Sequence, residues 1–187
     1  MVTIPILWTR IEEWYRHNVP AGHFRTNGPA SPDQIKAAEA SLELTLPQDV
    51  IETYLIHNGS TSPVFPYGYN LSTLDEMKKD WSSWMAGEPE AHKLLEVLDP
   101  IELIQRDYFW HPRWVPIATN QSGDHDILDL APAAGGTIGQ IIDFSHEVGA
   151  CRVVASSWRD HLQQLVDGLE SGKYHWEENG WWITPGE

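Results

Sequence analysis

The chain has 187 residues, which is enough for one domain with its own core and too short to predict two. Its apolar fraction of 41% is ordinary for a globular protein and argues against a disordered chain. The 27 Asp and Glu residues outnumber the 12 Lys and Arg residues, giving a formal charge of -15. Such a charge repels nucleic acid and anionic membranes and attracts basic partners, although solubility alone explains it equally well.

Cysteine content and targeting signals indicate the compartment. Cys151 is the only cysteine, so no intramolecular disulfide can form. Its neighbours predict a strand in which the thiol is a small buried hydrophobic group. Residues 1–7 lack the basic start and long apolar run of a secretory signal, and no stretch is apolar over the length of a membrane span. We therefore expect a cytoplasmic protein.

The first hundred residues predict helices. Leu7, Ile11 and Trp14 recur on one stripe, which is the spacing of a buried helix face. Ser31 and Gln34 form a capping-box pattern, in which each side chain bonds the backbone N–H of the other residue. We expect helices over 5–17, from Pro32 to about Leu42, from Pro47 to about Asn58, from Ser72 (with Asp75 as its reciprocal cap) to Gly87, and over 90–98.

The pattern changes after residue 113, where short apolar runs alternate with turn residues. Strands are expected over 114–119, 126–130, 140–144 and 152–155, and a terminal hairpin over 174–176 and 181–184. Ser157 is expected to cap a last helix, with Asp160 at the capping-box position. Helices followed by consecutive strands and a closing helix predict an α+β fold: a single domain with a largely antiparallel twisted sheet flanked by helices.

Asp124, His125 and Asp126 form the best metal-like cluster in the sequence, with Asp129 nearby. Hard cations prefer several carboxylate oxygens at close range. An EF-hand loop beginning at Asp124, however, needs Gly at its sixth position and Glu at its twelfth, where this chain has Asp129 and Gly135. On a strand, Asp124 and Asp126 share one face and Asp129 points to the other. We therefore predict a turn followed by a strand, and no bound metal.

Other catalytic patterns are also incomplete. The glycine-rich run 135–139 precedes an apolar strand and contains no Lys, which is typical of a hairpin connection rather than a phosphate-binding loop. None of the nine His residues falls in a His-Glu-x-x-His pattern, and the Ser156–Ser157 pair lacks a Gly-x-Ser-x-Gly elbow. We therefore predict no catalytic residue and no cofactor, and expect a binding protein rather than an enzyme.

Ten Trp residues are unusual for one domain. Trp8, Trp81 and Trp158 lie on helix stripes, where core packing explains them. Aromatic residues in loops or near the chain ends are better candidates for partner contact, because Trp and Tyr are enriched at interface hot spots. Together with two acidic residues at a turn, the candidate partner-binding set is Tyr67, Tyr69, Trp110, Asp124, Asp126 and Trp182.

A pattern of residues runs in order from Ser31 to Tyr174. It consists of Ser31, Ile35, Glu39, Leu46-Pro47, Tyr54, Asn58-Gly59, Leu71, Trp114 to Ala118, Gly123-Asp124, Asp129-Leu130, Gly139-Gln140, His146, Ser156 to Trp158, and Gly172 to Tyr174. In order and spacing this set resembles the SMI1/KNR4 family, also called the SUKH superfamily. The insert 86–113 departs from the simplest form of the family pattern.

The resemblance implies an α+β domain with a sheet covered by helices. The whole chain, 1–187, is then one domain with a core over about 31–174, on which the N-terminal helix and the C-terminal hairpin pack. Bacterial members resemble immunity proteins that bind and block a cognate toxin, often a nuclease. Fungal members regulate cell-wall synthesis and carry long disordered arms. The family has no established catalytic residues to transfer to this chain.

Because this sequence has no such arms, the resemblance favours an immunity protein that neutralises a cognate, basic protein toxin. The alternative is a scaffold or regulator of cell-wall synthesis or assembly. A small-molecule or metal-dependent enzyme using Asp124, His125 and Asp126 is a third hypothesis. The sequence identifies neither the partner nor the oligomeric state.

Overall fold

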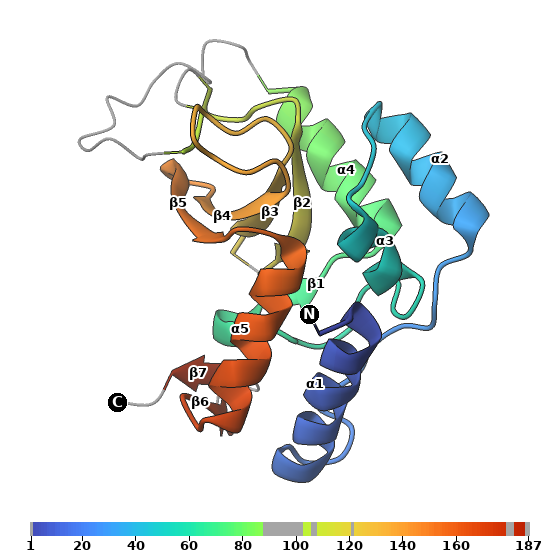
Figure 1. Ribbon diagram of the computed structural model, residues 1–187, viewed down its shortest axis with the longest axis vertical. Helices are drawn as coiled ribbons and strands as arrows, with labels where there is room; N and C mark the ends of the chain where they lie inside the picture. Colours follow the sequence, from blue (N-terminus) through green and yellow to red (C-terminus); the bar gives the residue numbers. More distant parts are fainter. Residues whose placement is uncertain (1, 88–102, 106–107, 121, 179–181, 186–187) are drawn as a thin grey trace.

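Helices precede strands along the chain in a computed structural model, which describes residues 2–87, 103–105, 108–120, 122–178 and 182–185 (Figure 1). The described elements are α1 (Ile4–Asn18), α2 (Pro32–Leu42), α3 (Gln48–Tyr54), η1 (Pro66–Gly68), β1 (Asn70–Leu71), α4 (Leu74–Met85), β2 (Trp114–Thr119), β3 (His125–Asp129), β4 (Gln140–Ser145), β5 (Gly149–Ala155), α5 (Trp158–Glu170), β6 (Tyr174–Glu177) and β7 (Trp182–Pro185). The predicted α+β class and antiparallel sheet are confirmed. The helix expected over 90–98 lies outside the described residues.

Five strands form one antiparallel sheet in the order β1-β2-β3-β4-β5, and β6 pairs with β7 in a separate hairpin. Strands β2 to β5 are neighbours both in the sheet and along the chain, whereas α4 and the insert 86–113 lie between β1 and β2 in sequence. The register aligns Val115 with Leu128 and Leu128 with Ile141. Because side chains alternate along a strand, this row points to one face of the sheet and the intervening residues point to the other.

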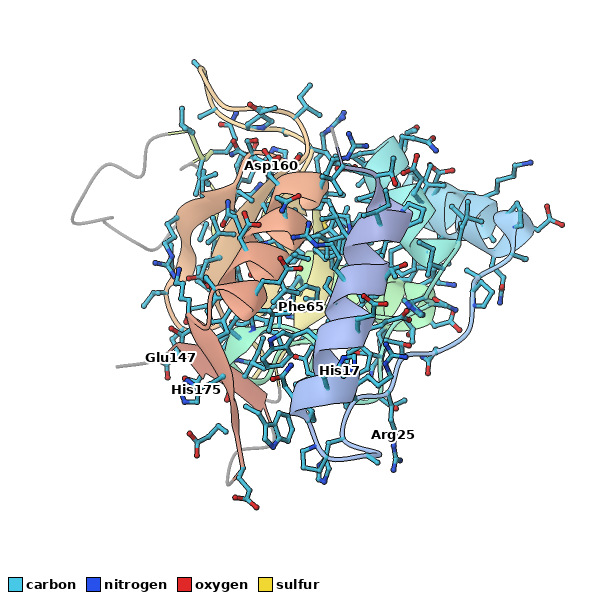
Figure 2. All side chains as sticks on the ribbon, turned by 60° about the horizontal axis from the view of Figure 1, so that its bottom comes forward. His17, Arg25, Phe65, Glu147, Asp160 and His175 are labelled. Carbon is cyan, nitrogen blue, oxygen red and sulfur yellow. The ribbon has the colours of Figure 1, made fainter. Side chains whose placement is uncertain are left out.

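The main core lies on the face that carries Leu128, beneath α1 and α5. The two helices lie side by side in both views (Figures 1 and 2), and buried residues of both belong to this core. Trp8 of α1 and Trp158 of α5 both donate from Nε1 to the hydroxyl of Thr53 on α3, at 3.3 and 2.7 Å. All three side chains are buried. A single hydroxyl thus satisfies two buried indole groups where three helices meet.

A second, aromatic core fills the opposite face of the sheet. Trp84 of α4 stacks on Trp110, with ring centroids 5.3 Å apart and planes at 13°. Phe144 of β4 meets both rings edge-on, at 5.1 and 5.2 Å. Trp110 and Phe109 belong to the 86–113 insert, so the described part of that insert covers the second face of the sheet.

The chain ends also pack on this body. Arg10 of α1 donates from Nε to Glu170 of α5 at 2.7 Å, and Ile183 of β7 is buried in the main core. None of the helices in the described segments is long and apolar enough to cross a membrane. Cys151 lies on a strand as expected but is exposed, so its predicted burial is wrong.

Two of the helix caps predicted from the sequence are confirmed, and one lies at a different residue. Ser31 and Gln34 form the predicted capping box, and Ser157 accepts from the backbone N–H of Asp160. The next box belongs to Thr73 and Glu76, one residue later than expected from Ser72 and Asp75. Ser72 is instead buried next to β2, with its backbone N–H bonded to Ile117 at 3.0 Å. Sheet pairing therefore holds Ser72 in an extended conformation and delays the helix.

Thr73→Ala is expected to lower the free energy of unfolding by about 1 kcal/mol, because the N–H of Glu76 loses its side-chain acceptor. Thr45→Ala, at an exposed loop position, is the matched control and should change stability by less than about 0.5 kcal/mol. Urea denaturation of both variants checks this. Equal stability of the two variants would show that Thr73 does not cap α4.

Candidate partner-binding cleft

A cleft of about 610 Å³ opens between the segment 65–69, strands β3 to β5, and α5. Phe65, Leu165 and Val154 supply apolar wall, and three carboxylates contribute polar surface. Phe65 fixes one side, because its ring lies 5.7 Å from that of Trp158 and 5.4 Å from that of His161 on α5 (Figure 2). The cleft is therefore built on packed elements rather than on a free loop.

Strand register brings two of the carboxylates together. Asp126 of β3 lies directly opposite Asp143 of β4, and Asp143 lies opposite Arg152 of β5. The three residues form a charged row on the face that holds the main core, at its open end beside α5. Like charges placed directly opposite on neighbouring strands are unfavourable. The fold therefore tolerates a local electrostatic cost at the cleft.

Each carboxylate has one basic neighbour. Arg152 Nε lies 3.3 Å from Asp143 Oδ2, and His146 Nδ1 lies 2.8 Å from Asp124 Oδ1. His161 Nε2 lies 3.2 Å from Asp126 Oδ2 but makes no well-directed hydrogen bond to it. The Asp126–His161 pair is therefore a close contact rather than a hydrogen bond. Asp126 is held less firmly by its basic neighbour than Asp124 is by His146.

Burial and mutual repulsion shape the electrostatics of the cleft. Burial raises the pKa of Asp143, and the neighbouring charge of Asp126 raises it further, against the opposing effect of Arg152. Burial also raises the pKa of Tyr69, with contributions from the same two carboxylates and from Asp124. Burial is thus the main cause of both shifts, and the neighbouring carboxylates add to it.

Asp124 differs from the other two carboxylates because it holds turns together. It accepts from Asn120 Nδ2 at 3.1 Å and from the backbone N–H of His146 at 3.1 Å, so it ties the β2–β3 turn to the β4–β5 turn. Burial alone would raise its pKa, but the hydrogen bonds from His146 and Asn120 outweigh burial and lower it. Asp124 is thus a structural residue at the edge of the cleft.

Two tyrosines form the aromatic rim. Tyr67 is 61% exposed and has a left-handed backbone conformation, with φ of 62°. Tyr69 is half-buried, and the backbone of Val64 and Phe65 bonds to its carbonyl. A large aromatic side chain held in the left-handed region is uncommon, since only Gly and Asn adopt it at little cost. The segment 65–69 therefore presents Tyr67 to solvent beside the acidic row.

With the fold and the cleft described, comparison with known proteins identifies the family. A family model described as the SMI1 / KNR4 family (SUKH-1) matches residues 29–164. The chain belongs to the SMI1/KNR4 family. The cleft combines residues inside the matched range, including Tyr67 and Asp143, with Lys173 and Tyr174 beyond it.

Fungal proteins of known name are similar to nearly all of this SMI1/KNR4 chain. A glucan synthesis regulatory protein of Neurospora crassa is 26% identical, covering 92% of this chain and 39% of its own length. A cell wall biosynthesis/cell cycle regulator of Schizosaccharomyces pombe is 29% identical, with 92% and 37% covered. A cell wall assembly regulator of Saccharomyces cerevisiae is 27% identical, with 91% and 41% covered. The chain thus spans about two fifths of the length of these relatives.

These relatives correct the function expected from the sequence. The prediction of a toxin-neutralising immunity protein is wrong, because proteins named for cell-wall synthesis and assembly match more than nine tenths of this chain. The prediction rested on the absence of long arms, which carries no weight when the chain aligns with only part of each relative. The alternative stated with it, a regulator of cell-wall synthesis or assembly, agrees with these names.

The SMI1/KNR4 fold brings four of the six predicted partner-binding residues to the cleft, namely Tyr67, Tyr69, Asp124 and Asp126. The expected exposure of Trp110 is wrong, because it is 2% exposed and stacked on Trp84 in the second core. Trp182 lies on β7, and its side chain lies outside the described residues. That the four cleft residues contact a partner stays a prediction.

Sequence reasoning missed Asp143, Arg152 and His161, which also line the cleft. Alternation within β4 places Asp143 on the face of Ile141, and this much was available from the sequence. The pairing of Asp143 with Asp126 needed the register of β3 with β4, and its pairing with Arg152 needed the register of β4 with β5, which two bulges shift. His161 needed the docking of α5 on the sheet, which no local pattern specifies.

The residues of the metal-enzyme hypothesis do not converge. Asp124 and Asp126 line the cleft, whereas His125 points to the opposite face, where its Nε2 accepts from Trp84 Nε1 at 3.1 Å. Asp129 is buried on that opposite face and accepts from Trp114 Nε1 at 3.1 Å. Within the described residues, no three His, Cys, Asp or Glu side chains are grouped as a metal ion would need.

Burial of His125 predicts a pH dependence of stability. Burial lowers its pKa to about 4, against the opposing charges of Asp124 and Asp126. Because the unfolded value is about 6.5, the unfolded chain gains a proton first as the pH falls, and stability is lost from about pH 6.5 downward. Between pH 7.5 and 5.0 this group should cost about 2 kcal/mol.

Urea denaturation at both pH values, for the native protein and His125→Gln, isolates this effect. Asp129 and Asp143 have raised pKa values, so their protonation stabilises the folded protein as the pH falls. This contribution is expected to be the same in the native protein and in His125→Gln. His125→Gln should therefore lose about 2 kcal/mol less than the native protein over this range. An equal loss in the two proteins would exclude His125 as the source.

Proposed function

We propose that this SMI1/KNR4 domain regulates cell-wall synthesis or assembly by binding a partner protein, and that it catalyses no reaction. The observation that carries the proposal is the alignment of more than nine tenths of the chain with fungal proteins named as regulators of glucan synthesis and cell-wall assembly. These regulators are longer than the chain, so the proposal concerns the part of their function that the shared domain performs.

The cleft supports binding as the mode of action. Its apolar wall of Phe65, Leu165 and Val154 lies beside the carboxylates of Asp124, Asp126 and Asp143, a mixture of surfaces that is typical of a protein interface. The cleft is open and has an exposed tyrosine at its rim, and Tyr is enriched at protein interfaces. A polypeptide segment suits such a surface.

A basic protein is the partner that the charge favours. The chain has a formal charge of -15, and the electrostatic field of such a protein speeds encounter with a positive surface. The same field repels nucleic acid and anionic lipid. We propose a cytoplasmic setting for this encounter.

Deleting the gene in the organism that makes the protein tests the function. Deletion is expected to change the amount of wall polysaccharide and to slow growth in the presence of a wall-damaging compound. The native gene should restore both. A double variant, Asp126→Asn with Asp143→Asn, should restore less than half of the growth, because it removes the negative charge of the cleft while keeping the side-chain shapes.

Asp33→Asn with Glu43→Gln is the matched control. Both residues are exposed on or just after α2, away from the cleft, and the pair changes the net charge by the same amount. The control should restore growth fully. A deletion without any effect on the wall would overturn the proposed function, and full restoration by the folded cleft variant would exclude the cleft as the site.

A further inference from the structure

We infer that the cleft binds an arginine side chain from a basic segment of the partner, and that Arg152 occupies this position in the free protein. The inference rests on the proposed function only in taking the cleft as the site of partner contact. It identifies the contacting group of the partner as a guanidinium, with which Arg152 of the protein itself competes for the cleft.

The charged row gives the first argument. Asp126 and Asp143 face each other across β3 and β4, where two like charges raise the free energy of the fold. Burial is the main cause of the raised pKa of Asp143, and the charge of Asp126 raises it further. A cation that bridges both carboxylates would relieve the repulsion, whereas Arg152 reaches only Asp143.

Arg152 is a weakly held occupant. Its side chain is 70% exposed, and its ion pair with Asp143 is 3.3 Å long and made through Nε. Ion pairs this exposed contribute little to stability, because solvent screens them and the long side chain loses freedom. A second guanidinium presented by a partner can therefore replace Arg152 at small cost.

The aromatic rim favours arginine over lysine. Tyr67 and Tyr69 line the cleft beside the carboxylates, and a planar guanidinium stacks on aromatic rings while bonding two carboxylate oxygens. The rim already holds a cation near a ring, since Lys173 Nζ lies 5.3 Å from the centroid of Tyr174. The volume of about 610 Å³ is larger than one side chain needs, which suits a segment of a chain rather than a free amino acid.

Charge argues against other occupants. A second copy of this chain brings its own formal charge of -15, and an anionic ligand would have to approach three carboxylates. Arg152, Lys173 and His161 also line the cleft, so binding of an acidic peptide is the competing outcome that the experiment has to exclude.

Fluorescence anisotropy with a labelled hexa-arginine peptide at 0.15 M salt, where the Debye length is about 8 Å, tests the inference. The native protein should bind this peptide at least threefold more tightly than hexa-lysine, and should not bind hexa-glutamate. Asp126→Asn with Asp143→Asn should weaken hexa-arginine binding at least tenfold. Asp33→Asn with Glu43→Gln should weaken it less than twofold.

Arg152→Gln gives the sharpest result, because removing a residue of the site should raise affinity. Hexa-arginine should bind this variant at least threefold more tightly. Arg16→Gln is the matched control: its side chain is 67% exposed and pairs with Glu13 on α1, so the charge change and exposure are nearly the same. It should change affinity less than 1.5-fold. Thermal unfolding within about 3 °C of the native protein verifies that each variant is folded.

Three results would overturn the inference. One is an equal loss of hexa-arginine affinity in the Asp126→Asn, Asp143→Asn variant and in its Asp33→Asn, Glu43→Gln control, which would show that binding depends only on net charge. Another is an unchanged or lower affinity of Arg152→Gln relative to Arg16→Gln. The third is binding of hexa-glutamate in place of hexa-arginine. These binding measurements use purified protein and need no cell wall, so they can support the inference even if gene deletion leaves the wall unchanged. Conversely, gene deletion can support the proposed function even if the protein does not bind hexa-arginine.

Discussion

Thr53→Val is expected to lower the free energy of unfolding by about 3 kcal/mol, although valine has the same shape and is more apolar. The hydroxyl of Thr53 accepts from both Trp8 and Trp158, and each of these buried indole groups would be left without its partner. Leaving a buried donor unsatisfied costs about 1–3 kcal/mol, and here two donors are affected. Urea denaturation measures the loss.

Thr53→Ser is the matched control, because it keeps the hydroxyl and removes only a methyl group. It should cost about 1 kcal/mol, the value of one buried methyl. The order of stability is therefore native, then Ser, then Val, whereas hydrophobicity alone would make the valine variant the most stable of the three. A valine variant as stable as the serine variant would show that the two indoles do not depend on Thr53.

Phe144→Ala is expected to cost about 4 kcal/mol, the usual range for deleting a buried aromatic ring. Phe144 packs edge-on against Trp84, Trp110 and Phe109, so its loss leaves a cavity where α4, the sheet and the insert meet. Tryptophan fluorescence should shift to the red as well, because the stacked pair gains access to water. Urea denaturation followed by fluorescence measures both effects.

Phe144→Leu keeps most of the volume and should cost less than about 1.5 kcal/mol. The stability losses of the two variants together distinguish a tightly packed second core from a sheet face that is only loosely covered. If Phe144→Ala loses less than about 1 kcal/mol, residues 108–110 do not pack on the sheet as described.

Local patterns were enough to predict most of the described helices and strands, although η1 and β1 were not predicted. The Ser31–Gln34 box, the apolar run 140–144 and the cap at Ser157 each depend on residues within a few positions, and the structure agrees with them. The α4 cap was misplaced by one residue because sheet pairing of Ser72 decides it. Long-range contacts therefore set even a helix boundary that looked local.

The site was less predictable than the fold. Tyr67, Tyr69, Asp124 and Asp126 were chosen as loop aromatics and turn acids, and packing places all four at one cleft. Trp110 was chosen on the same grounds and is buried, because its partner Trp84 comes from a distant helix. Neither the β3–β4–β5 register nor the stacking of two indoles can be derived from spacing along the chain.

The class of function was also beyond the sequence alone. No motif recognised in the sequence separates a toxin inhibitor from a wall regulator. The names of the fungal relatives favour the wall regulator, and the cleft is the surface at which we propose that a partner binds.

The most direct test of the cleft as the partner site is photo-crosslinking in the cells that make the protein. A benzoylphenylalanine is placed at Tyr67, at the cleft rim, or at Ile6, an exposed position on α1. We predict an adduct from position 67 whose partner peptide contains arginine, its loss in the Asp126→Asn, Asp143→Asn background, and no matching adduct from position 6. The same adduct from both positions, or its persistence in the cleft variant, would contradict the account.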